Sequence, residues 1–274
     1  MGPALALVSA VSFGISDFTG GLAAKRSSSV AVAAIAQVTG LLVLLPALFW
    51  LPGSPSLAAF GIGAIAGLAG ASGLVVYLRG MAIGPMGVVS PLAALIGAAL
   101  PVTYGVWLGE RMSTSNVIGV VLGLAAVVAV AYTPGQLASA NIRGPLLALT
   151  GGAAFGLFFV LLDATPADSG MWPLLGARLA AITLVGSLWW RSSAGSASRS
   201  ATQLAVLSGT LDMLANILFL LAVRSDLLSL TSLLASLYPV VVVVMARHLL
   251  AERLSVLQAS GVAAALVGTA LVVI

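Results

Sequence analysis

The sequence predicts an all-α membrane protein with ten transmembrane helices, arranged as two inverted five-helix repeats. Two observations support this prediction. First, the 274 residues are 61% hydrophobic and only 7% charged, whereas a soluble domain carries about 25% charged residues. Second, one unit of the chain occurs twice, with an offset of 142 residues. We therefore expect a polytopic membrane protein built by duplication.

The duplication is clearest between residues 90–130 and residues 232–272. Aligned without a gap, the two stretches are identical at 13 of 41 positions. The identical positions include Ser90/Ser232, Glu110/Glu252, Arg111/Arg253, Ser113/Ser255 and Gly119/Gly261. Several transporter folds contain weak internal repeats of this kind. The expected organisation is a first repeat at 1–133, a linker at 134–143 and a second repeat at 144–274.

Ten apolar runs, bounded by charged residues, proline, glycine and serine, mark the expected spans. They cover residues 3–23, 30–51, 57–78, 85–108, 114–133, 144–163, 171–190, 202–223, 227–249 and 255–273. About 20 apolar residues cross a bilayer, and a lipid-facing backbone must satisfy its own hydrogen bonds, so each run is predicted to be helical. Five is an odd number, so the second repeat enters the membrane from the opposite side. A substrate site is expected near the midplane, between the repeats.

Proline and glycine patterns predict how these helices bend and pack. Pro91, Pro101 and Pro239 lie inside the fourth and ninth spans and should kink them, because proline removes a backbone hydrogen bond. Ridges of small residues occur in the third, fifth and tenth spans, at Gly63, Gly67, Gly70, Gly119, Gly123 and Gly261. Small residues let helices approach closely in lipid. We expect the fifth and tenth spans to pack small face to small face.

Basic residues predict the orientation in the membrane. The joints after odd-numbered spans hold Lys25, Arg26, Arg79, Arg143, Arg191, Arg199, Arg247 and Arg253. The other joints hold only Arg111 and Arg224. By the positive-inside rule the first set of joints is cytoplasmic, which places both termini outside.

Composition also limits the partners. The net charge is +4, but 10 of the 11 basic residues are spread along the joints and helix ends, a pattern that favours membrane anchoring over nucleic-acid binding. The chain has no cysteine, so disulfides and thiolate metal sites are excluded. We expect a small-molecule substrate and membrane lipid as partners, with no nucleic acid, metal or cofactor. The expected form is a monomer in a bacterial cytoplasmic (inner) membrane.

One motif resembles a known family. Residues 82–113 read AIGPMGVVSPLAALIGAALPVTYGVWLGERMS, and the second copy ends in LAERLS at 250–255. These stretches resemble the EamA family of the drug/metabolite transporter superfamily, and the resemblance covers the full chain. It implies a ten-helix secondary transporter, usually an exporter of small metabolites or amino acids, with a central cavity between the halves. Such proteins usually keep both termini in the cytoplasm, so the resemblance implies the orientation opposite to the charge count.

Three charged residues lie deep inside predicted spans. Asp17, Arg178 and Asp212 occur in the first, seventh and eighth spans, where a charge costs at least about 2.5–3.5 kcal/mol to insert. Their counterparts in the other repeat carry no charge and are Phe159, Ala36 and Gly70. Residues that only maintain the fold would be expected in both repeats, so charged residues found in one repeat alone indicate a function. The alternative is a buried structural ion pair.

One face of the eighth span collects polar residues. Ser208, Asp212 and Asn216 recur every four residues, which places them on the same side of a helix. Arg178 can grip a carboxylate with two hydrogen bonds, while this face offers acceptors for an amine. The expected substrate is therefore a zwitterion, such as an amino acid or a similar metabolite, or an amphiphilic drug.

Further candidate substrate-binding residues lie in other spans. Phe155, Phe158 and Phe159 form an aromatic patch on the sixth span, for which core packing is the alternative role. The remaining polar or amphipathic candidates are Gln37, Tyr77, Tyr104, Trp172, Ser236 and Tyr238. We expect the substrate to bind between the seventh and eighth spans and the aromatic patch.

Asp17 is the candidate for proton coupling. If Arg178 pairs with Asp212, Asp17 has no basic partner inside the membrane. Burial disfavours an ionised carboxylate, so Asp17 is predicted to hold a proton in one state of the transporter and release it in another. The alternative is that Asp17 is hydrogen-bonded to Ser12, Ser16 or the backbone, and that transport is uncoupled facilitation.

Two further features have competing interpretations. Glu110 and Arg111 follow the fourth span, as Glu252 and Arg253 follow the ninth. They could form a gate latch, but their repetition favours an interfacial ion pair that caps a helix.

The alternative function is an intramembrane serine protease. The segment Gly70-Ala71-Ser72-Gly73 fits a G-x-S-G motif, with His248 as a possible base. Four small residues arise easily in a glycine-rich helix, however, and two inverted repeats have no place in that mechanism. His248 is also expected at the membrane interface, next to Arg247.

Overall fold

The computed structural model describes residues 1–84, 86–131, 143–192 and 197–249, and scattered positions between 256 and 271. These residues form helices and short joints, with no strand among them. The helices are α1 (Gly2–Ala24), α2 (Ser29–Trp50), α3 (Leu57–Ile83), α4 (Met86–Trp107), α5 (Thr114–Ala131), α7 (Arg143–Asp163), α8 (Trp172–Arg191), α9 (Arg199–Val223), α10 (Leu228–Ala235) and α11 (Tyr238–Leu249). A 3-10 turn, η1 (Ala167–Ser169), precedes α8.

Eight helical stretches in the described part are long and apolar enough to cross a membrane. They correspond to the first four predicted spans and to the sixth through ninth. The helix α5 occupies the place of the fifth span, and its residues Val117–Ala126 form an apolar stretch. Most of the tenth predicted span lies outside the described residues. The prediction of an all-helical membrane protein is therefore confirmed.

Exposed aromatic residues lie at the helix ends. Phe49 and Trp50 end α2, Trp107 ends α4, and Trp189 and Trp190 lie in the last turn of α8. Tryptophan is enriched where a helix leaves the hydrocarbon for the headgroup region. The helices α2 and α4 are the second and fourth spans, whereas α8 is the seventh. Because even-numbered and odd-numbered spans end on opposite faces of a bundle, these aromatic residues lie at both faces of the membrane.

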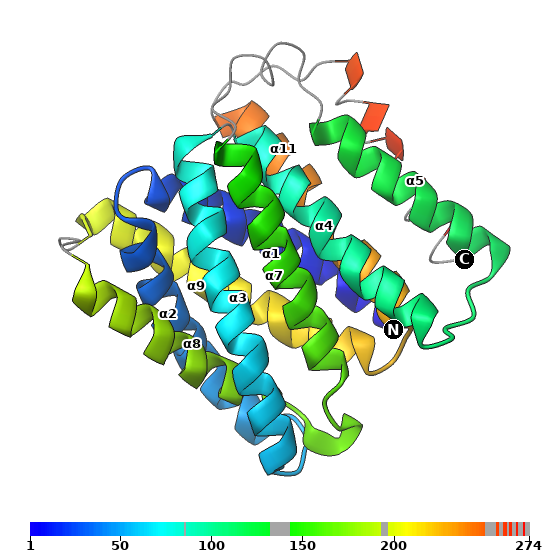
Figure 1. Cartoon of the computed structure of the whole chain (residues 1–274), viewed down its shortest axis with the longest axis horizontal. Coiled ribbons are helices and arrows are strands. Elements are labelled where there is room, and N and C mark those ends of the chain that lie inside the picture. The colour runs from blue at the N-terminus through cyan, green and yellow to red at the C-terminus, as the bar shows by residue number, and fades with distance from the viewer. Residues whose placement is uncertain are drawn as a thin grey trace.

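Helices of the first half pack mainly on helices of the second half (Figure 1). The helix α3 lies against α7 and α8, and α9 lies against α1 and α2. Under the 142-residue offset these are equivalent pairs, because α3 corresponds to α9, α1 to α7 and α2 to α8. The helix α5 lies at the edge of the bundle beside α4 (Figure 1).

Glycines allow these crossings. A Cβ atom at Gly67 of α3 would overlap the backbone of Ala177 in α8. Its repeat counterpart, Gly209 of α9, faces the backbone of Ala36 in α2 in the same way. In α5, Gly123 faces the side chain of Leu233 in α10. Most of the tenth span, expected against this small face, lies outside the described residues.

The prolines act differently in the two halves. The helix α4 continues unbroken through Pro91 and Pro101. The ninth span, predicted as one kinked helix, is instead two helices that meet at residues 236–237. Pro239 has no N–H to donate to the carbonyl four residues earlier. There, each N–H bonds to the carbonyl three residues earlier instead of four. Leu237 N donates to Leu234 O at 3.2 Å, and Val240 N donates to Leu237 O at 3.0 Å.

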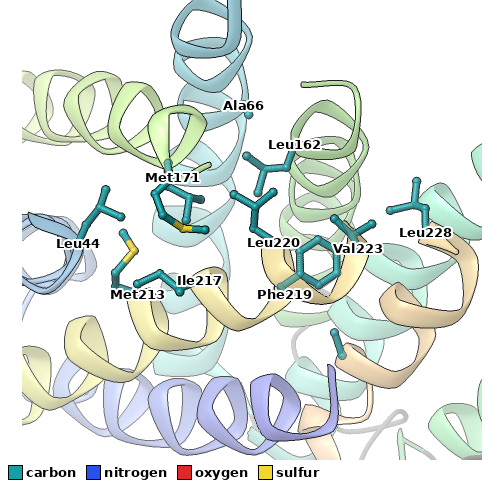
Figure 2. Packing of buried hydrophobic residues seen from close by; sticks show 12 residues of the cluster. Leu44, Ala66, Leu162, Met171, Met213, Ile217, Phe219, Leu220, Val223 and Leu228 are labelled. Atoms are coloured by element: carbon teal, nitrogen blue, oxygen red, sulfur yellow. The ribbon is translucent and has the colours of Figure 1, made fainter. Parts of the chain in front are cut away.

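A buried apolar cluster supports the middle of the bundle. Figure 2 shows side chains of α9, among them Met213 and Leu220, pointing toward Leu44 of α2 and Leu162 of α7. Phe158 and Phe159 pack against the same cluster. The cluster therefore holds α9, which carries Asp212 and Asn216, against helices of both halves.

Candidate substrate-binding cavity

A cavity lies between the two halves, near the middle of the spans. Helices α1, α2, α3 and α4 of the first half line it, together with α7, α8, α9 and the junction of α10 with α11. Its polar lining residues are Asp17, Gln37, Arg178, Asp212, Asn216, Ser236 and Tyr238. Its aromatic lining residues are Phe13, Phe155, Phe158 and Phe159. The remaining lining residues are glycine, alanine and leucine, so the site is largely apolar with a few convergent polar groups.

All candidate site residues from the sequence line this cavity except Ser208, Tyr77, Tyr104 and Trp172. Ser208 points instead to α1, where its carbonyl oxygen accepts a hydrogen bond from Ser16 Oγ at 2.8 Å. The physical reason is helix geometry. Each step of four residues turns a helix by 40° past a full circle, so Ser208 is rotated by about 80° from Asn216. Ser208 therefore does not line the cavity that Asp212 and Asn216 line.

A buried ion pair joins α8 to α9. Arg178 Nη2 donates to Asp212 Oδ2, and Arg178 Nη1 donates to Gln37 Oε1 on α2. The Arg178 side chain is 7% exposed and that of Asp212 is 24% exposed. Gly40 leaves room for the guanidinium, because a Cβ atom there would lie 3.0 Å from Arg178 Cζ. The pairing follows the sequence prediction, whereas the roles of Gln37 and Gly40 were not visible in any motif.

Asn216 lies one turn beyond Asp212. Its Nδ2 donates to the backbone carbonyl oxygen of Asp212 at 2.8 Å. This bond orients the amide, because its own oxygen would be repelled by that carbonyl. Asn216 is only 4% exposed, and its Oδ1 is buried with no hydrogen-bond partner. An unpaired buried oxygen is unfavourable, so its presence in the cavity wall requires an explanation.

Asp17 has a hydrogen-bond partner but no ion-pair partner among the described residues. Tyr77 Oη donates to Asp17 Oδ2 at 2.7 Å, so Tyr77 lies behind the cavity wall rather than in it. The partners expected from the sequence have other contacts. Ser12 Oγ donates to Val8 O at 2.9 Å, and Ser16 Oγ donates to Ser208 O. The alternative that these serines bind the Asp17 side chain is therefore not what the structure shows.

The aromatic patch includes rings from both halves. The ring centroids of Phe13 and Phe159 are 6.1 Å apart, and those of Phe158 and Phe159 are 5.6 Å apart. Phe13 also lies 6.4 Å from the ring of Tyr238. Phe13 was missed as a candidate, although its equivalence with Phe155 in the repeat was a signal that both rings face the same centre.

Glu110 caps a helix of the other half. Its Oε1 accepts from the backbone N of Leu228 at 2.9 Å, and its Oε2 accepts from Ser229 N at 3.1 Å. These are orphan donors in the first turn of α10, where a carboxylate is also favoured by the helix dipole. Gly109, with φ of 86°, turns the chain back so that Glu110 reaches them. Of the two interpretations, helix capping matches this contact.

Other contacts tie together the same face of the bundle. Arg224, after α9, donates from Nη1 to Thr165 O and from Nη2 to Thr165 Oγ1, both at 2.6 Å. Burial lowers the pKa of Arg224 from its ordinary value, and the nearby Asp163 and Asp168 carboxylates oppose this effect. Ser54 N donates to Asp168 O at 2.9 Å, which joins the two halves. All these residues belong to joints after even-numbered spans or to the helix ends beside them.

The residues of the protease alternative have separate surroundings. Ser72 is exposed on α3, and its hydroxyl donates to Leu68 O of the same helix at 2.7 Å. His248 is exposed in the last turn of α11. No hydrogen bond joins the two within the described residues, and Ser72 is not part of the cavity lining.

Comparison with known proteins agrees with the fold and the duplication. The model of the EamA-like transporter family matches residues 1–132 and residues 142–274. One solved crystal structure is similar to 97% of this chain and 98% of its own, with a TM-score of 0.69 and 19% sequence identity. At that identity the likeness concerns the fold alone. No curated protein matches the chain.

Proposed function

The chain belongs to the EamA-like transporter family, and from this premise we propose that it is a secondary active transporter. It exports small metabolites, such as amino acids or amphiphilic drugs, by alternating access through the central cavity. The observation that carries the proposal is the position of Asp17, Arg178, Asp212 and Asn216. These polar residues meet in an otherwise apolar cavity in the middle of the spans and between the halves. Intramembrane ionisable residues in such places mark substrate and proton pathways.

The proposal includes the inverted repeat. Its support is the equivalence of the contacts that α3 and α9 make, each with two helices of the other half. If the halves are inverted copies, a cavity between them can open to either side by a rocking motion. The contacts of Glu110 with α10 and of Ser54 with Asp168 join the two halves, so they would hold one face closed and would break when that face opens.

Proton coupling is assigned to Asp17. The Arg178–Asp212 pair is neutral, so the ionised cavity carries one negative charge, on Asp17. Tyr77 holds one oxygen of this carboxyl group. Uptake and release of one proton at Asp17 would change the charge of the cavity between transport states, which links substrate movement to a proton gradient.

Transport in proteoliposomes tests the proposed function. The purified protein is reconstituted, and accumulation of labelled amino acids and cationic drugs is followed with and without an imposed pH gradient. Gradient-driven accumulation of at least one compound is the expected result. Equilibration without accumulation would support the uncoupled facilitator instead, and the absence of any protein-dependent flux would refute the transporter proposal for this set of compounds.

A further inference from the structure

The cavity offers no free cation to a ligand. Among the described residues, Arg178 is the only basic residue that lines the cavity. Both ends of its guanidinium are occupied, by Asp212 Oδ2 and Gln37 Oε1. The side chain is also enclosed, with 7% of its surface exposed and Gly40 against it. Asp212 already neutralises the charge of Arg178, and so little of this side chain is exposed that a ligand carboxylate has poor access to its remaining N–H groups.

Three polar side chains in the cavity wall offer acceptors to a ligand, while the Tyr238 hydroxyl can donate or accept. Asn216 Oδ1 is buried and has no partner. The Asp17 carboxylate receives one hydrogen bond, from Tyr77, at Oδ2. Ser236 Oγ donates its own hydrogen to Ser232 O at 2.6 Å, so it can only accept from a ligand. A ligand that satisfies these groups must bring hydrogen-bond donors.

The charge and the rings point to the same chemistry. With Arg178 and Asp212 paired, Asp17 is the remaining carboxyl group among the described residues of the lining. A positively charged group on the ligand would neutralise the Asp17 carboxylate. Aromatic faces attract cations as well as apolar bodies, and Phe13, Phe159 and Tyr238 form a connected group of rings across the two halves.

We propose that the cavity selects protonated organic amines with an apolar or aromatic body, and that it discriminates against the corresponding amino acids. The ammonium group lies between Asn216 Oδ1 and the Asp17 carboxylate, and the body lies against the aromatic rings. The Arg178–Asp212–Gln37 group is part of the wall and does not receive a substrate carboxylate. This inference rests on the proposed function, because it takes the cavity as the transport site. It replaces the zwitterion expected from the sequence with a monocation.

Binding of matched probes tests the selection. Isothermal titration of the protein in nanodiscs compares 2-phenylethylamine and phenylalanine amide, which are cations, with phenylalanine and with 3-phenylpropionate. Phenylalanine amide differs from phenylalanine by the loss of the carboxylate charge. The carboxylate of phenylalanine would lose its hydrogen bonds to water without gaining a free cation in the cavity. We therefore expect phenylalanine to bind about 10- to 100-fold more weakly than its amide. No binding of 3-phenylpropionate is expected. Equal or tighter binding of phenylalanine, or no binding of either amine, would overturn the inference.

Variants at Asn216 test the proposed contact. Asn216→Leu keeps a similar volume but removes the acceptor, so amine binding should weaken by about tenfold. Asn216→Asp keeps an acceptor oxygen and should retain binding. Ser72→Ala, exposed and outside the cavity, is the matched control. Thermal unfolding checks that each variant is folded. If Asn216→Leu binds amines as the unchanged protein does, or if Asn216→Asp loses binding as Asn216→Leu does, the contact is wrong.

The selection of amines and the transport activity can be tested separately. Titration in nanodiscs needs no gradient and no conformational cycle. If amino acids are accumulated in proteoliposomes but amines do not bind, the amine inference fails and the transporter proposal stands. If amines bind in the predicted order but no compound crosses the membrane with the protein present, the selection stands and the transport proposal fails.

Discussion

At the residue scale, the Arg178–Asp212 pair is the most consequential contact. Two charges inside a membrane protein are tolerated because each neutralises the other and further hydrogen bonds satisfy their remaining atoms. Gln37 provides such a bond for Arg178. Sequence alone identified the two charges, because burying either one without a partner is costly.

Removing one partner of this pair should destabilise the protein strongly. Asp212→Asn leaves the buried guanidinium without its counter-charge, at an expected cost of about 3–5 kcal/mol. The double variant Arg178→Met/Asp212→Leu removes both charges and should recover most of that loss. Thermal unfolding in detergent measures both. A double variant as unstable as Asp212→Asn would show that the loss does not come from an uncompensated charge.

Asp17 should be essential for coupling and dispensable for downhill movement. Asp17→Asn cannot exchange a proton, but it keeps an oxygen to accept from Tyr77. We expect loss of gradient-driven accumulation with partial retention of exchange down a concentration gradient, both measured in proteoliposomes. Tyr77→Phe, which leaves Asp17 titratable, is the matched control and should still accumulate substrate. Accumulation by Asp17→Asn would exclude Asp17 as the proton carrier.

At the scale of elements, a nearby proline divides the ninth span into two helices, and a residue from the other half of the chain caps the first of them. Pro239 ends the hydrogen-bond pattern, so α10 is a separate helix of only 8 residues. Glu110, from the end of α4, satisfies its first N–H groups. The short helix is therefore fixed at one end by the other half of the molecule, while residues at its other end line the cavity.

Loss of the cap should weaken this arrangement. Glu110→Ala removes both acceptors of Leu228 N and Ser229 N and should destabilise the protein by about 1–2 kcal/mol. Glu110→Gln keeps one side-chain oxygen and should cost less. Thr103→Ala, on the same helix and exposed, is the control, since its hydroxyl bonds only within α4. Equal unfolding temperatures for Glu110→Ala and Thr103→Ala would contradict the capping role.

At the scale of the whole molecule, two equivalent joints can reveal both inversion and orientation. Ser54 follows α2 and Arg191 ends α8, and these helices are repeat counterparts. The chain has no native cysteine, so single cysteines can be introduced directly. If the repeats are inverted, the two joints lie on opposite sides of the membrane. By the positive-inside rule, the joint at Arg191 is cytoplasmic.

Labelling of intact cells with an impermeant thiol reagent should therefore modify Ser54→Cys and spare Arg191→Cys. Permeabilised cells should show labelling at both positions, which controls for accessibility. The reverse pattern would support the orientation that the family resemblance implies. Labelling of both positions from outside, or of neither, would contradict the inverted repeat.

The helices and the buried charges were predictable from the sequence because both depend on local composition and on the solvent. Lipid demands apolar runs of about 20 residues and a cause for each intramembrane charge. The structure confirms the all-helical membrane class, and the family model confirms the resemblance. The pairing of Arg178 with Asp212 also followed, since one guanidinium and a nearby carboxylate had no better way to remain inside.

Only the tertiary structure decided which side chains meet. Ser208 does not line the cavity because four residues turn a helix slightly more than one full circle, which places Ser208 toward α1. Phe13 packs against Phe159 of the aromatic patch. Glu110 accepts a hydrogen bond from Leu228 of α10, which is 118 residues away in the sequence. Such contacts depend on the crossing of helices from different halves. That crossing is determined by which small residues let two backbones approach, as at Gly67 and Gly209, and no local pattern encodes the rotation that results.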